Sequence, residues 1–269
     1  MSALESVLRR ERVIVAAGLT ALTALAWVYI WRGAGMGMSA LTMTKLALFP
    51  HLTPEPMPDM AMPPIGWLPV VAMWWVMMIA MMIPSATPFV LLYARVMRHA
   101  AAQNPQAVTY VSTTSLVAGY LLAWLLFSVA ASAIQYVLQR AGMISPMMLW
   151  SQSALLSAAV LAAAGIYQLS PLKLVCLQQC RSPAQFLTQH WRKGRGGALR
   201  MGIEHGVWCI GCCWLLMALL FVGGVMNLVW IALLAVLVLC EKLLPASAVT
   251  SRLSGALLIA WSIATLLVR

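Results

Sequence analysis

Four residues that bind soft metals lie within nine positions of the chain, at His205, Cys209, Cys212 and Cys213. On a helix, residues three or four positions apart share one face, so these side chains point in a common direction. Met217 extends the same face by another turn. Thiolate and thioether sulfur favour monovalent copper, and imidazole tolerates it. The segment therefore predicts a soft-metal site on one helix, although buried cysteine can also be plain packing.

Methionines form a second candidate ligand group in the apolar segment 67–93. Met77 and Met81 are one helical turn apart, and Met78 and Met82 lie beside them. Such a stripe offers thioether ligands that suit a soft monovalent ion. Packing is the competing interpretation, because methionine also fills irregular gaps in an apolar core.

Three further candidates lie near the ends of apolar segments. Cys176 and Cys180 occur in the basic stretch KLVCLQQCRSP, and Glu241 follows an apolar segment directly. An ionisable residue near the end of a membrane span is commonly functional, so we expect Glu241 to orient His205 or to carry a proton. The alternative is a simple ion pair with Lys242 or with a basic residue of the adjoining loop.

The elements that must position these residues are membrane helices. Apolar residues make up 63% of the 269 positions and charged residues only 9%, which excludes a soluble domain. Because a bilayer core takes about 20 residues per helix, the sequence predicts an all-α, polytopic bundle, a single transmembrane domain over residues 1–269. The seven expected spans are 13–31, 67–93, 109–137, 150–169, 203–222, 226–240 and 253–268.

Lysine and arginine predict the orientation, because they gather on the cytoplasmic side of a membrane. With the N-terminus inside, the outer segments carry only four of the seventeen, at Arg32, Lys45, Arg140 and Arg269. We therefore expect a cytoplasmic N-terminus and an outer C-terminus. A six-span arrangement is the alternative, and it would place Arg269 inside.

Two segments between the expected spans are long. The inner one, 170–202, is predicted as a basic cytoplasmic loop, and the outer one, 32–66, as a loop that its prolines keep irregular. Methionine gains little from burial in a solvated loop, so the outer methionines are candidate first ligands for an incoming ion. They are Met36, Met38, Met43, Met57, Met60 and Met62, with His51, Glu55 and Asp59 nearby.

Other classes of function lack their signatures. The basic residues lie scattered between apolar segments, so the net charge of +11 does not indicate a nucleic-acid partner. The sequence has no phosphate loop, dinucleotide fingerprint or nucleophile elbow. Asp59 is the only aspartate, and it cannot complete a catalytic triad from the outer loop. We expect neither an enzyme nor an organic cofactor.

Three motifs together resemble a bacterial family described as predicted metal-binding integral membrane proteins of unknown function. They are MWWVMMIAMMIPSATPF, YQLSPLKLVCLQQCRSP and HGVWCIGCCWLLMALLFVGGVMNLVW, all within residues 67–243. The resemblance implies a multi-pass protein of the bacterial inner membrane that binds metal. On matching positions it supports Met77, Met78, Met81, Met82, Cys176, Cys180, His205, Cys209, Cys212, Cys213, Met217 and Glu241.

The leading hypothesis is a protein that binds monovalent copper and translocates or delivers it along a ladder of ligands. The ladder runs from the outer methionines through segment 67–93 to the Cys/His face, with Cys176 and Cys180 beyond it. The expected partners are the lipid bilayer and a copper chaperone or membrane metalloenzyme. One alternative is an accessory subunit or assembly factor of such an enzyme. Another is a membrane thiol oxidoreductase with a bridge between spans, for example Cys213 to Cys240.

Overall fold

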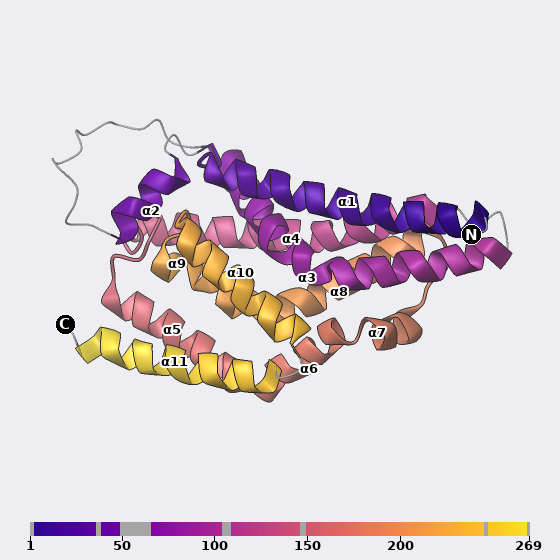
Figure 1. Cartoon of the computed structure of the whole chain (residues 1–269). Helices are drawn as coiled ribbons and strands as arrows, with labels where there is room; N and C mark the ends of the chain where they lie inside the picture. The colour runs from indigo at the N-terminus through magenta and orange to yellow at the C-terminus, as the bar shows by residue number, and fades with distance from the viewer. Residues whose placement is uncertain are drawn as a thin grey trace.

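Helices make up nearly all of the computed structural model, which describes residues 3–35, 39–48, 66–103, 109–145, 149–244 and 247–267 (Figure 1). Within these ranges the sole β feature is an isolated bridge between Ile144 and Ser151. The predicted all-α class is confirmed. The helices are α1 (Ala3–Trp31), α2 (Ala40–Leu48), α3 (Trp67–Gln103), α4 (Thr109–Arg140), α5 (Ala154–Leu169), α6 (Pro171–Arg181), α7 (Pro183–His190), α8 (Gly194–Ala218), α9 (Leu220–Gly223), α10 (Leu228–Leu243) and α11 (Ser247–Leu267).

Each of the seven apolar segments lies in a helix, but the helices differ in length. Five of them include a stretch long and apolar enough to cross a membrane: α1, α3, α4, α8 with α9, and α11. Helices α5 and α6 together make a sixth candidate, bent by 66° where they join. Helix α10 has 16 residues, fewer than the about 20 that a hydrocarbon core needs. The two chain ends lie at opposite ends of the bundle (Figure 1).

The segments expected as loops contain helices. Helix α2 lies within the outer segment and buries Met43, which is only 3% exposed. Residues 40–48 are therefore not irregular as predicted, since the prolines begin at Pro50 and leave this stretch free to form a helix. In segment 170–202, α6 and α7 follow one another. The remaining outer candidates lie outside the described residues: Met36, Met38, His51, Glu55, Met57, Asp59, Met60 and Met62.

Close approach of α4 and α8 fixes the helix that carries the cysteines. A Cβ atom on Gly202 of α8 would overlap the carbonyl oxygen of Leu116, and one on Gly119 of α4 would overlap that of Leu199. Small residues at such crossings let two backbones touch, which is how helices pack where the solvent is as apolar as they are. The crossing holds Tyr120 of α4 next to the first turns before Cys209.

Helix α3 continues unbroken through Pro84 and Pro88. Two neighbouring hydroxyls bond to helix carbonyls on either side of Pro84: Ser85 donates to Met82 O at 2.9 Å and Thr87 to Ile83 O at 2.9 Å. Side-chain hydroxyls of this kind compensate for the amide donors that proline lacks. The methionine stripe thus stays on one helix and faces the core.

Two polar turns bring α6 and α10 against α8. Ser170 ends α5 and caps α6 by accepting from Lys173 N, and Pro171 takes the first helical position. After α9, Gly224 has a φ of 93° and Asn227 caps α10 by accepting from Val229 N and Trp230 N. The predicted turn near the Gly-Gly pair is confirmed, and it sends α10 back along α8.

Candidate metal centre

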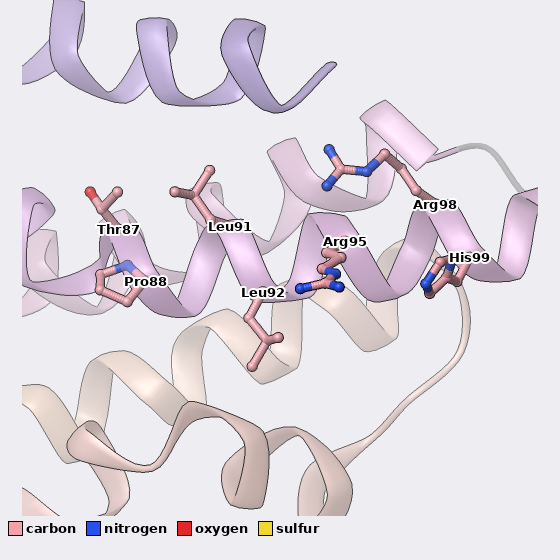
Figure 2. A pocket seen from close by; sticks show the side chains of 7 residues that line it. All are labelled: Thr87, Pro88, Leu91, Leu92, Arg95, Arg98 and His99. Atoms are coloured by element: carbon pink, nitrogen blue, oxygen red, sulfur yellow. The ribbon is translucent and has the colours of Figure 1, made fainter. Parts of the chain in front are cut away.

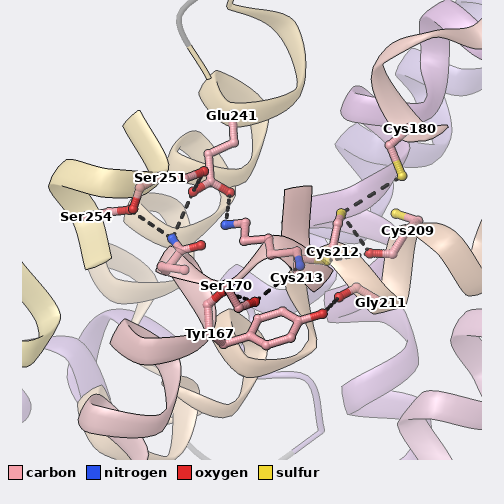
Figure 3. A network of polar contacts seen from close by, with 12 residues as sticks. Tyr167, Ser170, Cys180, Cys209, Gly211, Cys212, Cys213, Glu241, Ser251 and Ser254 are labelled. Carbon is pink, nitrogen blue, oxygen red and sulfur yellow. Dashed lines mark hydrogen bonds and ion pairs between the residues drawn. The ribbon is translucent and has the colours of Figure 1, made fainter. Parts of the chain in front are cut away.

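Sulfur atoms from three helices converge in the core. Cys180 Sγ of α6 lies 3.9 Å from Cys212 Sγ of α8, and Cys213 Sγ lies 4.0 Å from Met82 Sδ of α3. Cys209, also on α8, is within interaction range of Cys180, Cys212 and Cys213. We call these four cysteines and Met82 the sulfur cluster. Figure 3 shows the Cys180, Cys209 and Cys212 sulfurs gathered at its upper right.

The sequence order along α8 explains why three cysteines can meet one point. Cys209 is one turn before Cys212 and Cys213, and both later thiols donate to its carbonyl oxygen, at 3.1 and 3.0 Å. These bonds turn both side chains back along the helix toward Cys209. All three residues are at most 2% exposed. The predicted shared face of α8 is therefore present, and it points inward.

A buried lysine sits at the centre of this arrangement. Lys242 Nζ of α10 lies 2.9 Å from Cys209 Sγ and 3.1 Å from Ser85 Oγ. The hydroxyl of Tyr120 lies 3.1 Å from the same sulfur and 3.4 Å from Met82 O. Lys242 is 6% exposed and Tyr120 2%. The Cys209 sulfur thus has an ammonium and a phenol hydroxyl as neighbours.

The preceding residue, Glu241, belongs to a separate polar network. Lys173 Nζ lies 2.6 Å from Glu241 Oε2, while Gln168 Nε2 and Ser251 Oγ donate to Oε1 at 2.8 and 3.2 Å. Ser254 joins this group, left of the sulfur cluster in Figure 3, through Gln168. The expectation that Glu241 orients His205 is wrong. The alternative, an ion pair with a basic residue of segment 170–202, is the arrangement found.

The two networks divide the buried charges unevenly. Lys173 and Glu241 form a neutral pair, with side-chain exposures of 0% and 2%. In the described part of the chain, Lys242 has no carboxylate partner. An isolated ammonium is costly to bury, so it requires an anion nearby. The Cys209 sulfur is the group in place to supply that charge as a thiolate, the form in which cysteine binds metal.

His205 lies in an aromatic layer one turn before Cys209. Its ring stacks on Phe89 with centroids 3.9 Å apart, and the rings of Phe186 and Tyr120 lie at 5.1 and 6.0 Å. Nδ1 of His205 is buried and has no hydrogen-bond partner among the described residues. A buried ring nitrogen without a partner is unusual. It leaves His205 available as a further ligand beside the cluster.

The other predicted ligands are in the core, but their roles stay predictions. Met77, Met78 and Met81 of α3 and Met217 of α8 are all at most 1% exposed and belong to the same core as the cysteines. Cys176 Sγ lies 3.0 Å from where a Cβ on Gly211 would stand, so α6 lies directly against α8. The ladder had placed Cys176 and Cys180 beyond the Cys/His face. The structure instead brings Cys180 into the cluster itself.

The sulfur separations suit a soft ion. At a metal–sulfur distance of ~2.3 Å, as in zinc–thiolate sites, tetrahedral or trigonal ligands lie about 3.8–4.0 Å apart. The Cys180–Cys212 and Cys213–Met82 pairs match this separation. Within the described ranges, however, no three or more His, Cys, Asp or Glu side chains form a ready-made metal shell. The cluster offers paired sulfurs from which an ion can also leave.

Sequence reasoning missed the polar partners of Cys209. Lys242 looked like a topology signal, because basic residues commonly follow a span. Tyr120 and Ser85 gave no signal in their own segments. Only the positions of α3, α4 and α10 around α8 bring these residues together. The polar patch expected at the end of α5 is present, since Gln168 contacts Glu241 and the Tyr167 hydroxyl donates to Gly211 O.

Comparison with known proteins adds one match. A family model described as PpoB2, a copper chaperone, matches residues 71–265. The match covers more than two thirds of the chain and includes α3, α8, α10 and the whole sulfur cluster. Neither a curated protein nor a solved structure matches the chain.

Proposed function

The chain belongs to the PpoB2 copper chaperone family, and from this premise we propose that it holds monovalent copper in the sulfur cluster and delivers it to a copper-dependent partner. The observation that carries the proposal is the convergence of thiols from α6 and α8 with the Met82 thioether of α3 at metal-like separations. Soft sulfur ligands of this kind select monovalent copper over harder divalent ions.

Charge balance supports a site built around thiolates. A cuprous ion held by two thiolates carries one net negative charge, which is expensive in an apolar interior. The Lys242 ammonium, 2.9 Å from Cys209 Sγ, offsets that charge. Before copper arrives, the same ammonium offsets a Cys209 thiolate. The site therefore changes little in net charge as copper enters and leaves.

Open coordination suits delivery. A closed shell of three or four rigid ligands retains its metal, as structural zinc sites do. Here the sulfurs come in pairs on separate helices, and α6 contributes Cys180 from a short helix joined to α5 at a sharp bend. Movement of α6 relative to α8 would remove one ligand and loosen the ion.

Placement in the bacterial inner membrane follows from the apolar helices. We infer seven crossings, with α10 as the shortest, a cytoplasmic N-terminus and an outer C-terminus. The location of the chain ends at opposite ends of the bundle supports an odd number (Figure 1). Six crossings remain the alternative, with α10 not spanning on its own. Translocation from the outer methionines is part of this proposal, and so is a copper chaperone or membrane metalloenzyme as partner.

Metal content tests the proposal. The chain, purified in detergent without oxygen and loaded with cuprous ion, should retain a stoichiometric amount of copper after desalting. Cys209→Ser/Cys213→Ser should lose most of it. Cys240→Ser is the matched control, because Cys240 is only half-buried and lies outside the cluster. Equal copper in the wild type and the double variant would refute the proposal.

A second candidate function, thiol oxidation and reduction, has one observation in its favour. Cys180 and Cys212 come from different helices, and their sulfurs are 3.9 Å apart, which a small movement could shorten to the ~2.05 Å of a disulfide. All six cysteines are free thiols in the structure. Thiol counting after exposure to oxidant, with and without bound copper, separates the two functions. The copper carrier predicts that copper protects these thiols.

A further inference from the structure

A basic pocket lies along α3, away from the sulfur cluster. Its volume is about 690 Å³, and it opens on one face of the second half of the helix (Figure 2). The residues lie three or four positions apart, so they share that face. The described residues that line it are Thr87, Pro88, Leu91, Leu92, Arg95, Arg98 and His99.

The lining changes character along the helix. Pro88, Leu91 and Leu92 form an apolar part toward the middle of α3, and Arg95, Arg98 and His99 form a basic part toward its end. At 1.5 Å per residue, the stripe is about 18 Å long. An elongated surface that is apolar at one end and cationic at the other matches an anionic amphiphile.

Arg98 is the residue that points to a ligand. Its side chain is 91% buried, since 9% is exposed, and its Nη1 atom has no hydrogen-bond partner among the described residues. No carboxylate of the described residues pairs with Arg95 or Arg98. A buried guanidinium nitrogen without a partner is costly, and a phosphate is the anion that guanidinium groups match best.

We propose that this pocket binds one anionic phospholipid. Its phosphate lies between Arg95, Arg98 and the His99 imidazole, and an acyl chain follows the apolar part of the stripe. In the proposed membrane orientation the basic end is cytoplasmic, at the level where anionic headgroups attract basic residues. The inference rests on that orientation and does not depend on the copper site.

The apolar part separates a lipid from free phosphate. A phosphate ion would use only the basic end of the pocket, whereas a phospholipid also covers the leucines and gains from that burial. Three leucine and proline side chains in line with the arginines have no role in binding a free anion. The shape of the pocket therefore favours the lipid.

Lipid retention by native mass spectrometry tests the proposal. The detergent-purified full chain is mixed with equal amounts of phosphatidylglycerol and phosphatidylcholine, and it should keep the anionic lipid preferentially. Each arginine near a headgroup contributes about a five-fold gain in binding, so Arg95→Gln/Arg98→Gln should bind phosphatidylglycerol about 25-fold more weakly. Arg195→Gln, an exposed basic residue at the start of α8, is the control and should bind normally.

Further arms decide the remaining outcomes. Arg98→Lys keeps the charge and should retain the lipid, which separates a binding defect from misfolding, and the melting temperature of each variant checks the fold. Excess inorganic phosphate should not displace phosphatidylglycerol, and displacement would overturn the assignment to a lipid. Equal retention by the wild type and Arg95→Gln/Arg98→Gln would overturn it as well. Cys209→Ser/Cys213→Ser should keep the lipid while losing copper, so the two proposals fail separately.

Discussion

Replacing Lys242 with methionine removes the charge that faces the sulfur cluster while keeping an apolar side chain of similar length. In the wild type, its ammonium lies 2.9 Å from Cys209 Sγ in a fully packed region. A unit charge about 4 Å from an ion–thiolate group interacts with it by roughly 4 kcal/mol at an effective dielectric constant near 20. Since about 1.4 kcal/mol is ten-fold in affinity, Lys242→Met should weaken copper binding by about 10²- to 10³-fold.

The same substitution should also change how binding depends on pH. With Lys242 in place, Cys209 is already a thiolate and releases no proton when copper arrives. Without the ammonium, Cys209 is a neutral thiol and must lose its proton first. One additional proton should therefore be released per copper bound. A plot of log affinity against pH should rise more steeply in the variant, by about one unit per pH unit.

Competition with a coloured cuprous chelator, without oxygen and at several values of pH, measures both quantities. Lys193→Met, an exposed residue just before α8, is the control for loss of a positive charge and should behave as the wild type. Lys242→Arg retains a cation and should recover part of the affinity. If Lys242→Met binds copper with unchanged affinity and unchanged pH slope, the assignment of Lys242 as counter-charge is refuted.

Three other substitutions test the elements that build the site. Glu241→Gln leaves Lys173 buried without its partner and should lower the free energy of unfolding by about 3–5 kcal/mol in a denaturant titration. Glu204→Gln, which breaks the more exposed pairs with Arg192 and Arg200, should cost less than about 1 kcal/mol, and similar losses in both would contradict the buried-pair assignment. Gly202→Ala forces a Cβ into the Leu116 carbonyl and should cost about 3 kcal/mol, visible as a lower melting temperature, whereas Gly196→Ala meets open space and should be near neutral. A harmless Gly202→Ala would mean that α4 and α8 are not in backbone contact. Met82→Leu keeps the volume but removes the thioether, so copper affinity should fall while the melting temperature holds. Met226→Leu, equally buried, should leave affinity unchanged, and equal affinity in both variants would remove Met82 from the site.

Local chemistry was enough to predict most of the helices. Apolar segments of bilayer length marked α1, α3, α4 and α11, and Gly224 with Asn227 marked the turn before α10. These features depend on residues close in sequence. Helix α2 was missed because proline and methionine content was averaged over the whole outer segment, although its own nine residues contain no proline.

The contents of the site could be predicted only in part. The spacing of His205, Cys209 and Cys213 showed that they share a face of α8, and the structure turns the two cysteines and the histidine into the core. Which partner each charge takes could not be predicted. Glu241 and Lys242 are adjacent, yet one faces Lys173 and the other Cys209, because α10 passes between two groups of helices. The position of Cys180 likewise depends on the bend at Ser170, which places α6 against α8.

X-ray absorption at the copper edge, on the chain loaded without oxygen, tests the central claim most directly. We predict a cuprous ion whose nearest neighbours are mainly sulfur, at about the 2.3 Å typical of metal–thiolate bonds. Cys180→Ser/Cys212→Ser should show fewer sulfur neighbours, because both members of the 3.9 Å pair are lost. A first shell of nitrogen or oxygen in the wild type, or an identical spectrum in the double variant, would contradict a copper site in the sulfur cluster.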